Sequence, residues 1–158
     1  MRDALVNLIV ALGPNLDPAE YGPQPEHIHL ERYIPQSLIL PRCDLVIAHG
    51  GFSTVLTTLA AGLPLVLIQI AADMFDNARR CAALDLGRVV EPDQRTAEGI
   101  REAVQRMLTT PTYQENAQRL RTEIEAQPDP THAVTLLEQL AADKRPLPRG
   151  HQQRCSNE

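Results

Sequence analysis

Hydrophobic residues in this chain fall into short runs that alternate with helical patterns. The runs are rich in Val, Ile and Leu and are bounded by Gly, Pro or polar residues, which predicts buried β-strands. The run near residue 30 instead alternates apolar and polar positions, as a half-buried strand does. Strands are predicted at residues 6–12, 27–34, 45–48, 63–70 and 88–90.

Helical patterns lie between these strands and after the last one. Asp17 and Pro18 predict the start of a short helix, and residues 36–41 predict a single helical turn. Strands that alternate with helices indicate an α/β fold, in this case a Rossmann-like, doubly wound, mostly parallel sheet followed by C-terminal helices. The longer helices are predicted at residues 54–61 (with Gly62 as C-cap), 73–86, 96–108, 111–126 and 130–142.

Composition narrows the class of protein. The 158 residues, 43% of them hydrophobic, predict one domain over residues 1–143 and a polar, disordered tail over residues 144–158. A net charge of −5 argues against a general nucleic-acid binder. Cys43, Cys81 and Cys155 are odd in number and lack CxxC spacing, which indicates a reduced, cytoplasmic protein without a disulfide framework or zinc site. No apolar run approaches the ~18 residues of a membrane span.

The loop after the third predicted strand carries the candidate chemistry. In parallel sheets, ligands bind beyond the carboxyl ends of the strands. Gly50 and Gly51 let the backbone approach a ligand, while His49, Ser53 and Thr54 add polar groups at the start of the next helix. The first N–H groups of a helix favour an anion such as phosphate. The alternative is that Ser53 or Thr54 simply caps the helix and that nothing binds there. The loop matches neither GxGxxG nor GxxxxGK[ST], which argues against a dinucleotide or ATP as the ligand.

Residues 31–90 contain several further motifs whose order and spacing can be compared with known families. Taken together, they resemble the C-terminal, nucleotide-sugar-binding half of GT-B-fold glycosyltransferases of the family-1 type, which includes macrolide, aglycone and plant secondary-metabolite glycosyltransferases. The matching motifs are Tyr33-Ile34-Pro35-Gln36, His49 with Gly51 and Thr54, Gly62-Leu63-Pro64, and Asp73 with Asn77-Ala78.

The resemblance implies a donor site for a UDP- or dTDP-sugar, with no metal and no further cofactor. Catalytic residues are not identified in this chain, because the general base of such enzymes belongs to the N-terminal half. Tyr33 could equally be an ordinary strand aromatic, and Asp73 an N-cap. The implied roles are the nucleobase and ribose for Tyr33, Ile34 and Gln36; the diphosphate for His49, Gly50, Gly51, Ser53, Thr54 and Asn77; and the donor sugar for Asp73 and Met74.

Three features depart from the resembled family. Met74 replaces a glutamine beside the sugar-binding aspartate, and since a thioether cannot donate a hydrogen bond, a deoxysugar or altered donor becomes plausible. Gln69 stands where the family usually has proline. The family domain also opens with a further strand and helix. Without them, the strand at residues 6–12 either pairs directly with the strand at residues 45–48 or leaves an unpaired edge in the middle of the sheet. We therefore expect reduced stability, or a partner that supplies the missing strand.

Two functions of different classes follow. The first is the donor-binding part of a glycosyltransferase that acts on a small-molecule hydroxyl acceptor and needs an N-terminal acceptor domain, a separate partner chain or a homo-oligomer. The second is a non-catalytic nucleotide-sugar binder or degenerate auxiliary protein. The element from Tyr33 to Gln36, followed by His49-Gly50-Gly51, argues against an epimerase or a cell-wall GlcNAc transferase of the same fold.

Overall fold

The computed structural model describes residues 6–129 and 131–144 of the chain. The chain forms two compact units, Met1–Glu125 and Ala126–Glu158. Apart from Lys144, the predicted tail lies outside the described residues. Among the helices in the described ranges, none is both long enough and apolar enough to cross a membrane.

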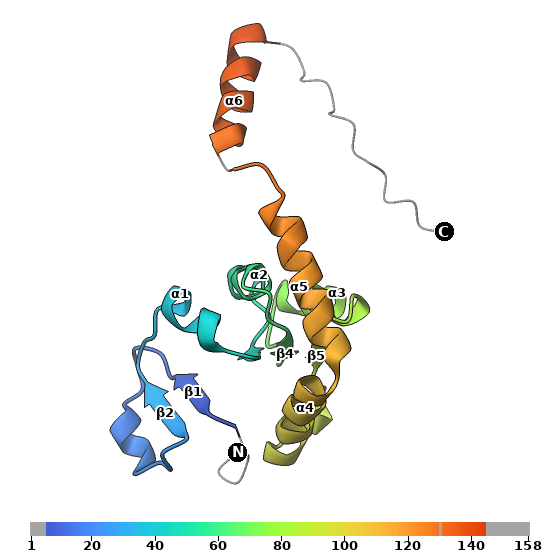
Figure 1. Ribbon diagram of the computed structural model, residues 1–158. Coiled ribbons are helices and arrows are strands. Elements are labelled where there is room, and N and C mark those ends of the chain that lie inside the picture. The colour runs from blue at the N-terminus through green and yellow to red at the C-terminus, as the bar shows by residue number, and fades with distance from the viewer. Residues whose placement is uncertain (1–5, 130, 145–158) are drawn as a thin grey trace. The chain divides into compact units, whose positions relative to one another are not determined.

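In the described part of the first unit, the strands pair in parallel in two separate sheets (Figure 1). One sheet has the order β1-β2, with Leu8 paired to Ile28. The other has the order β3-β4-β5, with Leu65 between Val46 and Gly87. The parallel α/β class is confirmed. The strands are β1 (Leu8–Ala11), β2 (Ile28–Glu31), β3 (Val46–Ala48), β4 (Leu65–Leu67) and β5 (Gly87–Val89).

β1 and β3 each have one edge that pairs with no other described strand. Among the described residues, no backbone ladder joins β1 to β3, so the chain shows the unpaired edge and not direct pairing. Ile9 in β1 is 45% exposed and Ile47 in β3 is 38% exposed, whereas every residue of β4 is buried. Because strands of parallel sheets are normally covered on both faces, the sheet core is complete only around β4.

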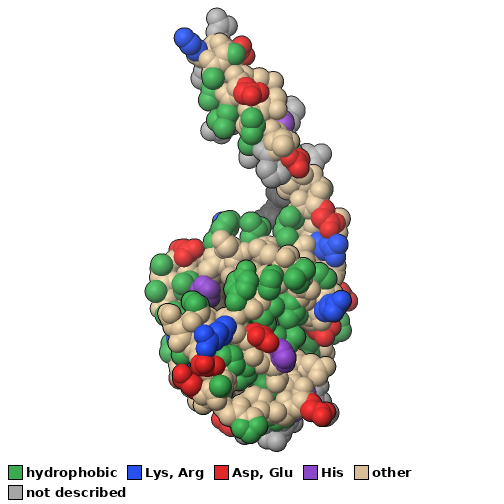
Figure 2. Space-filling model, turned by 90° about the vertical axis from the view of Figure 1, so that its left-hand side faces the viewer, with side chains coloured by type: hydrophobic (Ala, Val, Ile, Leu, Met, Phe, Trp, Pro, Cys, Tyr) green, Lys and Arg blue, Asp and Glu red, His purple; other side chains and the backbone are tan. Residues whose placement is uncertain are grey.

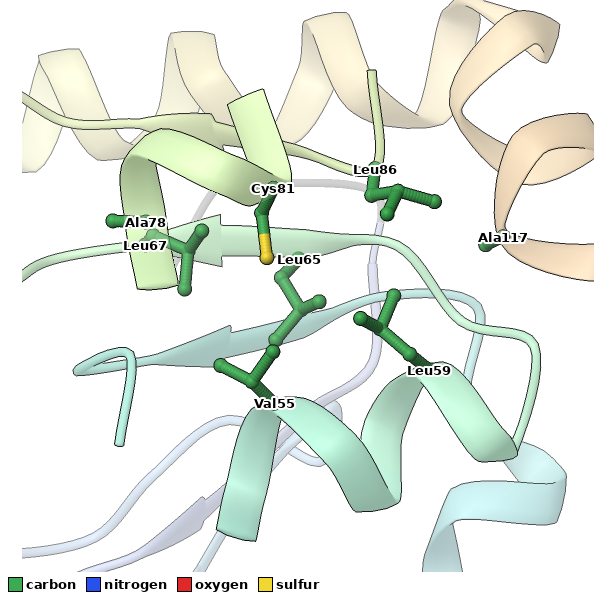
Figure 3. Close-up of a cluster of buried hydrophobic side chains, with 8 residues drawn as sticks. All are labelled: Val55, Leu59, Leu65, Leu67, Ala78, Cys81, Leu86 and Ala117. Atoms are coloured by element: carbon green, nitrogen blue, oxygen red, sulfur yellow. The ribbon is translucent and has the colours of Figure 1, made fainter. Parts of the chain in front are cut away.

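Helices cover both faces of the β3-β4-β5 sheet. On one face, Leu65 and Leu67 pack with Val55, Leu59 and Cys81, whose side chains point toward one another in Figure 3. On the other face, Val66 packs with the buried side chains of Ala103, Val104 and Met107, and Tyr113 packs against the same cluster. Burial raises the pKa of the Cys81 thiol, so this cysteine is an inert core residue. The first face carries α2 (Phe52–Ala60), α3 (Met74–Ala83) and α5 (Pro111–Glu125), and the second carries α4 (Ala97–Thr109).

Amide side chains of α5 donate hydrogen bonds to backbone carbonyls beyond the C-terminal ends of two other helices. Gln114 and Gln118 donate from Nε2 to the carbonyl of Gly62, at 3.0 and 3.2 Å, just beyond the end of α2. Asn116 donates from Nδ2 to the carbonyls of Leu84 and Asp85, at 3.3 and 3.4 Å, beyond the end of α3. These bonds pair carbonyls that a helix end leaves without an internal partner, and they fix α5 to the sheet layer.

Short helical turns fill the connections of the first unit. The predicted start at Asp17 is confirmed, since its carboxylate accepts from the N–H of Ala19. That bond, together with the Arg32 guanidinium, holds the pKa of Asp17 below its ordinary value. The predicted turn after Pro35 is also confirmed. The turns are η1 (Pro18–Tyr21), α1 (Gln36–Ile39), η2 (Leu40–Arg42) and η3 (Pro92–Gln94).

Element limits differ from the predicted ones mainly at the strands. The run over residues 63–70 yields only the three residues of β4, because the ladders to β3 and β5 are short. The helix expected at residues 54–61 begins two residues earlier, at Phe52, with Gly51 as its N-cap. In the second unit, α6 (Thr131–Asp143) matches the last predicted helix, and its apolar residues Val134 and Leu137 are exposed.

Candidate functional site

The turn from β3 into α2 forms an uncapped helix N-terminus. Gly50 is buried and has φ of +89°, a left-handed conformation that glycine adopts at little cost. Gly51 is the N-cap of α2 and, lacking a side chain, makes no capping hydrogen bond. Ser53 and Thr54 lie inside the first turn of α2 and neither is its N-cap, so plain N-capping by either hydroxyl is ruled out. The first N–H groups of α2 therefore carry no side-chain cap and suit an anion.

His49 lies against this turn with its imidazole exposed. A Cβ added to Gly51 would stand 2.6 Å from His49 Nε2, which is closer than two such atoms can approach. Glycine at this position therefore makes room for the imidazole at the start of α2. An imidazole N–H beside free backbone N–H groups gives two kinds of donor for one anion.

Asn77 joins the turn to the beginning of α3. Its Nδ2 donates to the carbonyl of Gly50 and to Oδ2 of Asp73, each at 3.0 Å. The main chain of α3 is also close, because a Cβ on Gly50 would lie 3.1 Å from the carbonyl oxygen of Met74. The structure thus brings together the residues implied for the diphosphate and those implied for the donor sugar, across 27 positions of sequence.

Asp73 occupies the N-cap position of α3, yet its carboxylate makes no capping hydrogen bond. It is exposed and accepts from Asn77 instead. Asp76, the second carboxylate of this segment, pairs with Arg79 at 2.7 Å. Within the described ranges, no group of three or more His, Cys, Asp or Glu side chains is arranged to hold a metal ion.

The residues implied for the nucleobase and ribose follow the carboxyl end of β2. Tyr33 is 78% exposed, Ile34 is half-buried, and Gln36 is the exposed first residue of α1. No hydrogen bond among the described residues joins these three to the turn at His49 and Gly50. Their assignment to the base and ribose stays a prediction.

Gln69 is a residue of this region whose position the sequence did not reveal. It follows β4 at the carboxyl edge of the sheet and is buried, unlike the neighbouring Ile70, which is 72% exposed. Side-chain alternation could have predicted this burial, because Leu65, Leu67 and Gln69 fall on one face of an extended chain.

The fold and the site together define a class. Helices cover both faces of a parallel sheet, and a glycine turn opens a helix N-terminus beyond the carboxyl end of a strand, as in proteins that bind nucleotides. The family model described as "Erythromycin biosynthesis protein CIII-like, C-terminal domain" matches residues 6–140. The chain belongs to this family, and the resemblance to the C-terminal half of GT-B glycosyltransferases is confirmed.

Relatives of this chain are glycosyltransferases of greater length. Demethyllactenocin mycarosyltransferase of Streptomyces fradiae is 35% identical over 139 residues, which are 88% of this chain and 30% of that enzyme. The crystal structure of CalG4, the calicheamicin glycosyltransferase, matches with a TM-score of 0.82 and 33% identity over 89% of this chain and 37% of that one. The glycosyltransferase VinC, solved in complex with dTDP, matches with a TM-score of 0.74 and 25% identity over 79% of this chain and 32% of that one. The chain thus spans about a third of the length of these proteins.

Proposed function

We propose that this chain binds a nucleoside-diphosphate sugar, with UDP or dTDP as its nucleotide, and serves as the donor-binding part of a glycosyltransferase. The sugar is transferred to a hydroxyl of a small-molecule acceptor in secondary metabolism. The observation that carries the proposal is the open N-terminus of α2, which His49 flanks and which Asn77 connects to Asp73.

The reaction explains why such a site is needed. Glycosyl transfer breaks the bond between the anomeric carbon and the diphosphate, so negative charge builds up on the leaving group. Donors aimed at that charge lower the barrier, and one well-placed donor contributes about 3 kcal/mol. The N–H groups of α2 and the His49 side chain would supply such donors without a metal ion. We propose no resident cofactor for the same reason.

Activity would require a second protein part. The acceptor hydroxyl must lose a proton to a general base, and the resembled family holds that base in its N-terminal half. Large apolar side chains are exposed in the first turns of α2 and α3, at Phe52 and Phe75, and in α1, at Leu38. Figure 2 shows hydrophobic side chains gathered on one face of the molecule. Monomeric proteins rarely leave large apolar patches uncovered. We propose that an acceptor-binding domain, a separate chain or a second copy covers them, and that the chain alone is inactive.

Met74 bears on the identity of the donor. It follows Asp73 directly and is half-buried at the first position of α3. A thioether offers an apolar, polarisable surface and no N–H group for a sugar hydroxyl. A deoxysugar donor, which lacks one of the hydroxyls of a hexose, fits this substitution better than glucose does.

The reaction would take place in the cytoplasm. Cys43 and Cys81 are free thiols, as expected in a reducing compartment.

The test is calorimetric titration of the chain with UDP, dTDP and the corresponding sugar nucleotides. We expect His49→Ala to weaken nucleotide affinity at least tenfold, because it removes a donor to the diphosphate. His29→Ala is the matched control, since His29 is an exposed histidine that pairs with Glu31 on β2 at 3.0 Å. If the wild-type chain binds none of these nucleotides, the proposal is wrong.

A non-catalytic nucleotide-sugar binder is the second candidate. Met74 favours it, because a thioether stands where the resembled family has a glutamine beside the sugar-binding aspartate. Nucleotide binding that persists without any transfer, after an acceptor-binding partner has been supplied, would favour this candidate over the enzyme.

A further inference from the structure

Gln69 lies at the carboxyl edge of the central strand β4. The last ladder pair between β3 and β4 joins Ala48 to Leu67, so two residues further along each chain stand Gly50 and Gln69. The main chain is still extended beyond the ladder, since Ile68 donates from its N–H to the carbonyl of Ala48 at 2.9 Å. Gln69 therefore lies level with the glycine turn that opens the candidate site.

Alternation along the extended chain assigns the Gln69 side chain to the sheet face that carries α2 and α3. Leu65 and Leu67 pack on that face, whereas Val66 and Ile68 pack on the face that α4 covers. The Leu67 side chain contacts the glycine turn, because its Cδ2 lies 3.7 Å from where a Cβ on Gly50 would be. By this alternation, the next position on the face belongs to Gln69, which precedes Asp73 by four residues.

Gln69 is 8% exposed, and its Oε1 is buried without a hydrogen-bond partner among the described residues. A buried, unpaired carbonyl is costly in a folded protein and calls for an explanation. Within the described ranges, the other buried side-chain atoms without a partner belong to His27, Thr58 and Arg101. Thr58 and Arg101 lie inside helices and His27 precedes a strand, so Gln69 alone among these four follows the carboxyl end of a strand.

The chemistry of the neighbourhood indicates what could pair with this oxygen. A diphosphate has only acceptor atoms at neutral pH and cannot satisfy a carbonyl. Sugar hydroxyls can donate, and they are the groups implied as ligands of Asp73, which follows Gln69 by four residues. The terminal torsion of a glutamine side chain is soft, so the carboxamide can turn toward a bound sugar without moving the backbone.

We propose that Gln69 is a specificity-determining residue of the donor site, whose Oε1 accepts a hydrogen bond from a hydroxyl of the donor sugar. This inference rests on the proposed function and adds to it a second polar contact, so that the sugar lies between Gln69 and Asp73. Donors that lack the hydroxyl in question leave the carbonyl unpaired and bind more weakly.

The experiment compares Gln69→Leu with the wild-type chain. Binding of UDP, UDP-glucose, dTDP and dTDP-L-rhamnose is measured by calorimetry, and thermal unfolding is measured without ligand. We expect Gln69→Leu to bind the preferred sugar nucleotide about tenfold more weakly and the free diphosphate within twofold of wild type. The unfolding temperature should stay equal or rise, because the variant removes an unpaired buried carbonyl.

Thr58→Val is the matched control. Thr58 is fully buried and its Oγ1 is also unpaired among the described residues, but it lies within α2, away from the strand end. We expect this variant to leave all four affinities unchanged. Gln69→Met, which keeps an unbranched side chain of similar length, replaces Gln69→Leu if the branched variant does not fold.

The outcomes separate this inference from the proposed function. A wild-type chain that binds no nucleotide overturns both. Nucleotide binding that no sugar strengthens, or unchanged sugar-nucleotide affinity in the Gln69 variants, overturns the inference and leaves the proposed function intact. An equal loss of affinity for the free diphosphate and the sugar nucleotide also overturns it, because the contact would then be to the nucleotide.

Discussion

At the scale of single residues, two adjacent glycines serve different purposes. Gly50 is required by its backbone, since φ is +89° and the carbonyl of Met74 lies 3.1 Å from the position of a Cβ. Gly51 has φ of −61°, which any residue adopts, and a Cβ there would meet only the end of the His49 side chain. The first glycine shapes the turn, and the second leaves room for the imidazole.

Alanine at Gly50 should therefore lower stability, whereas alanine at Gly51 should weaken nucleotide binding. Gly50→Ala is expected to lower the free energy of unfolding by about 1–2 kcal/mol, because a side chain is strained in the left-handed region. Gly51→Ala is expected to keep its stability but to bind nucleotide about tenfold more weakly, because His49 is displaced. Urea unfolding and calorimetric titration measure the two effects. Equal nucleotide affinity in Gly51→Ala and wild type would contradict the assigned role of His49.

At the scale of elements, α3 is fixed at both ends by asparagine side chains. Asn77 connects its first turns to the carbonyl of Gly50, on the side of the candidate site. Asn116, from α5, donates to the carbonyls of Leu84 and Asp85 beyond its last turn. Both side chains donate amide N–H groups to backbone carbonyls. Comparing the two alanine variants therefore separates an effect on nucleotide binding from an effect on stability.

Asn77→Ala and Asn116→Ala are each expected to lower the free energy of unfolding by about 1 kcal/mol, the usual contribution of such a bond. Only Asn77→Ala should also weaken nucleotide binding, by about tenfold, because it releases the turn from Asp73. Chemical denaturation and titration with dTDP test this. A similar loss of affinity in Asn116→Ala would indicate a general effect of stability and not a specific connection.

At the scale of the whole molecule, the division of the strands into two sheets limits stability. β1 and β3 present unpaired edges, and their Ile9 and Ile47 side chains are partly exposed. Exposed apolar strand edges promote pairing with other chains. A domain built around one complete strand, β4, has a small core for its length.

We therefore expect the chain by itself to unfold at a low temperature or to associate as its concentration rises. Ile9→Lys should reduce association, because a charge on an edge strand opposes pairing. Leu16→Lys is the control, since Leu16 is similarly exposed, at 41% against 45% for Ile9, but lies outside any strand. Sedimentation and calorimetry test this, and a monomer with one sharp transition at every concentration would contradict it.

The sequence by itself determined the α/β class, the order of the elements and the loop that holds the site, because periodicity and glycine placement are local properties. It also identified Asn77 and Asp73, though not the bond between them. The structure alone decided that Asn77 reaches Gly50 across 27 positions and that β1 and β3 do not pair. These depend on contacts between residues far apart in the chain, which no local pattern encodes.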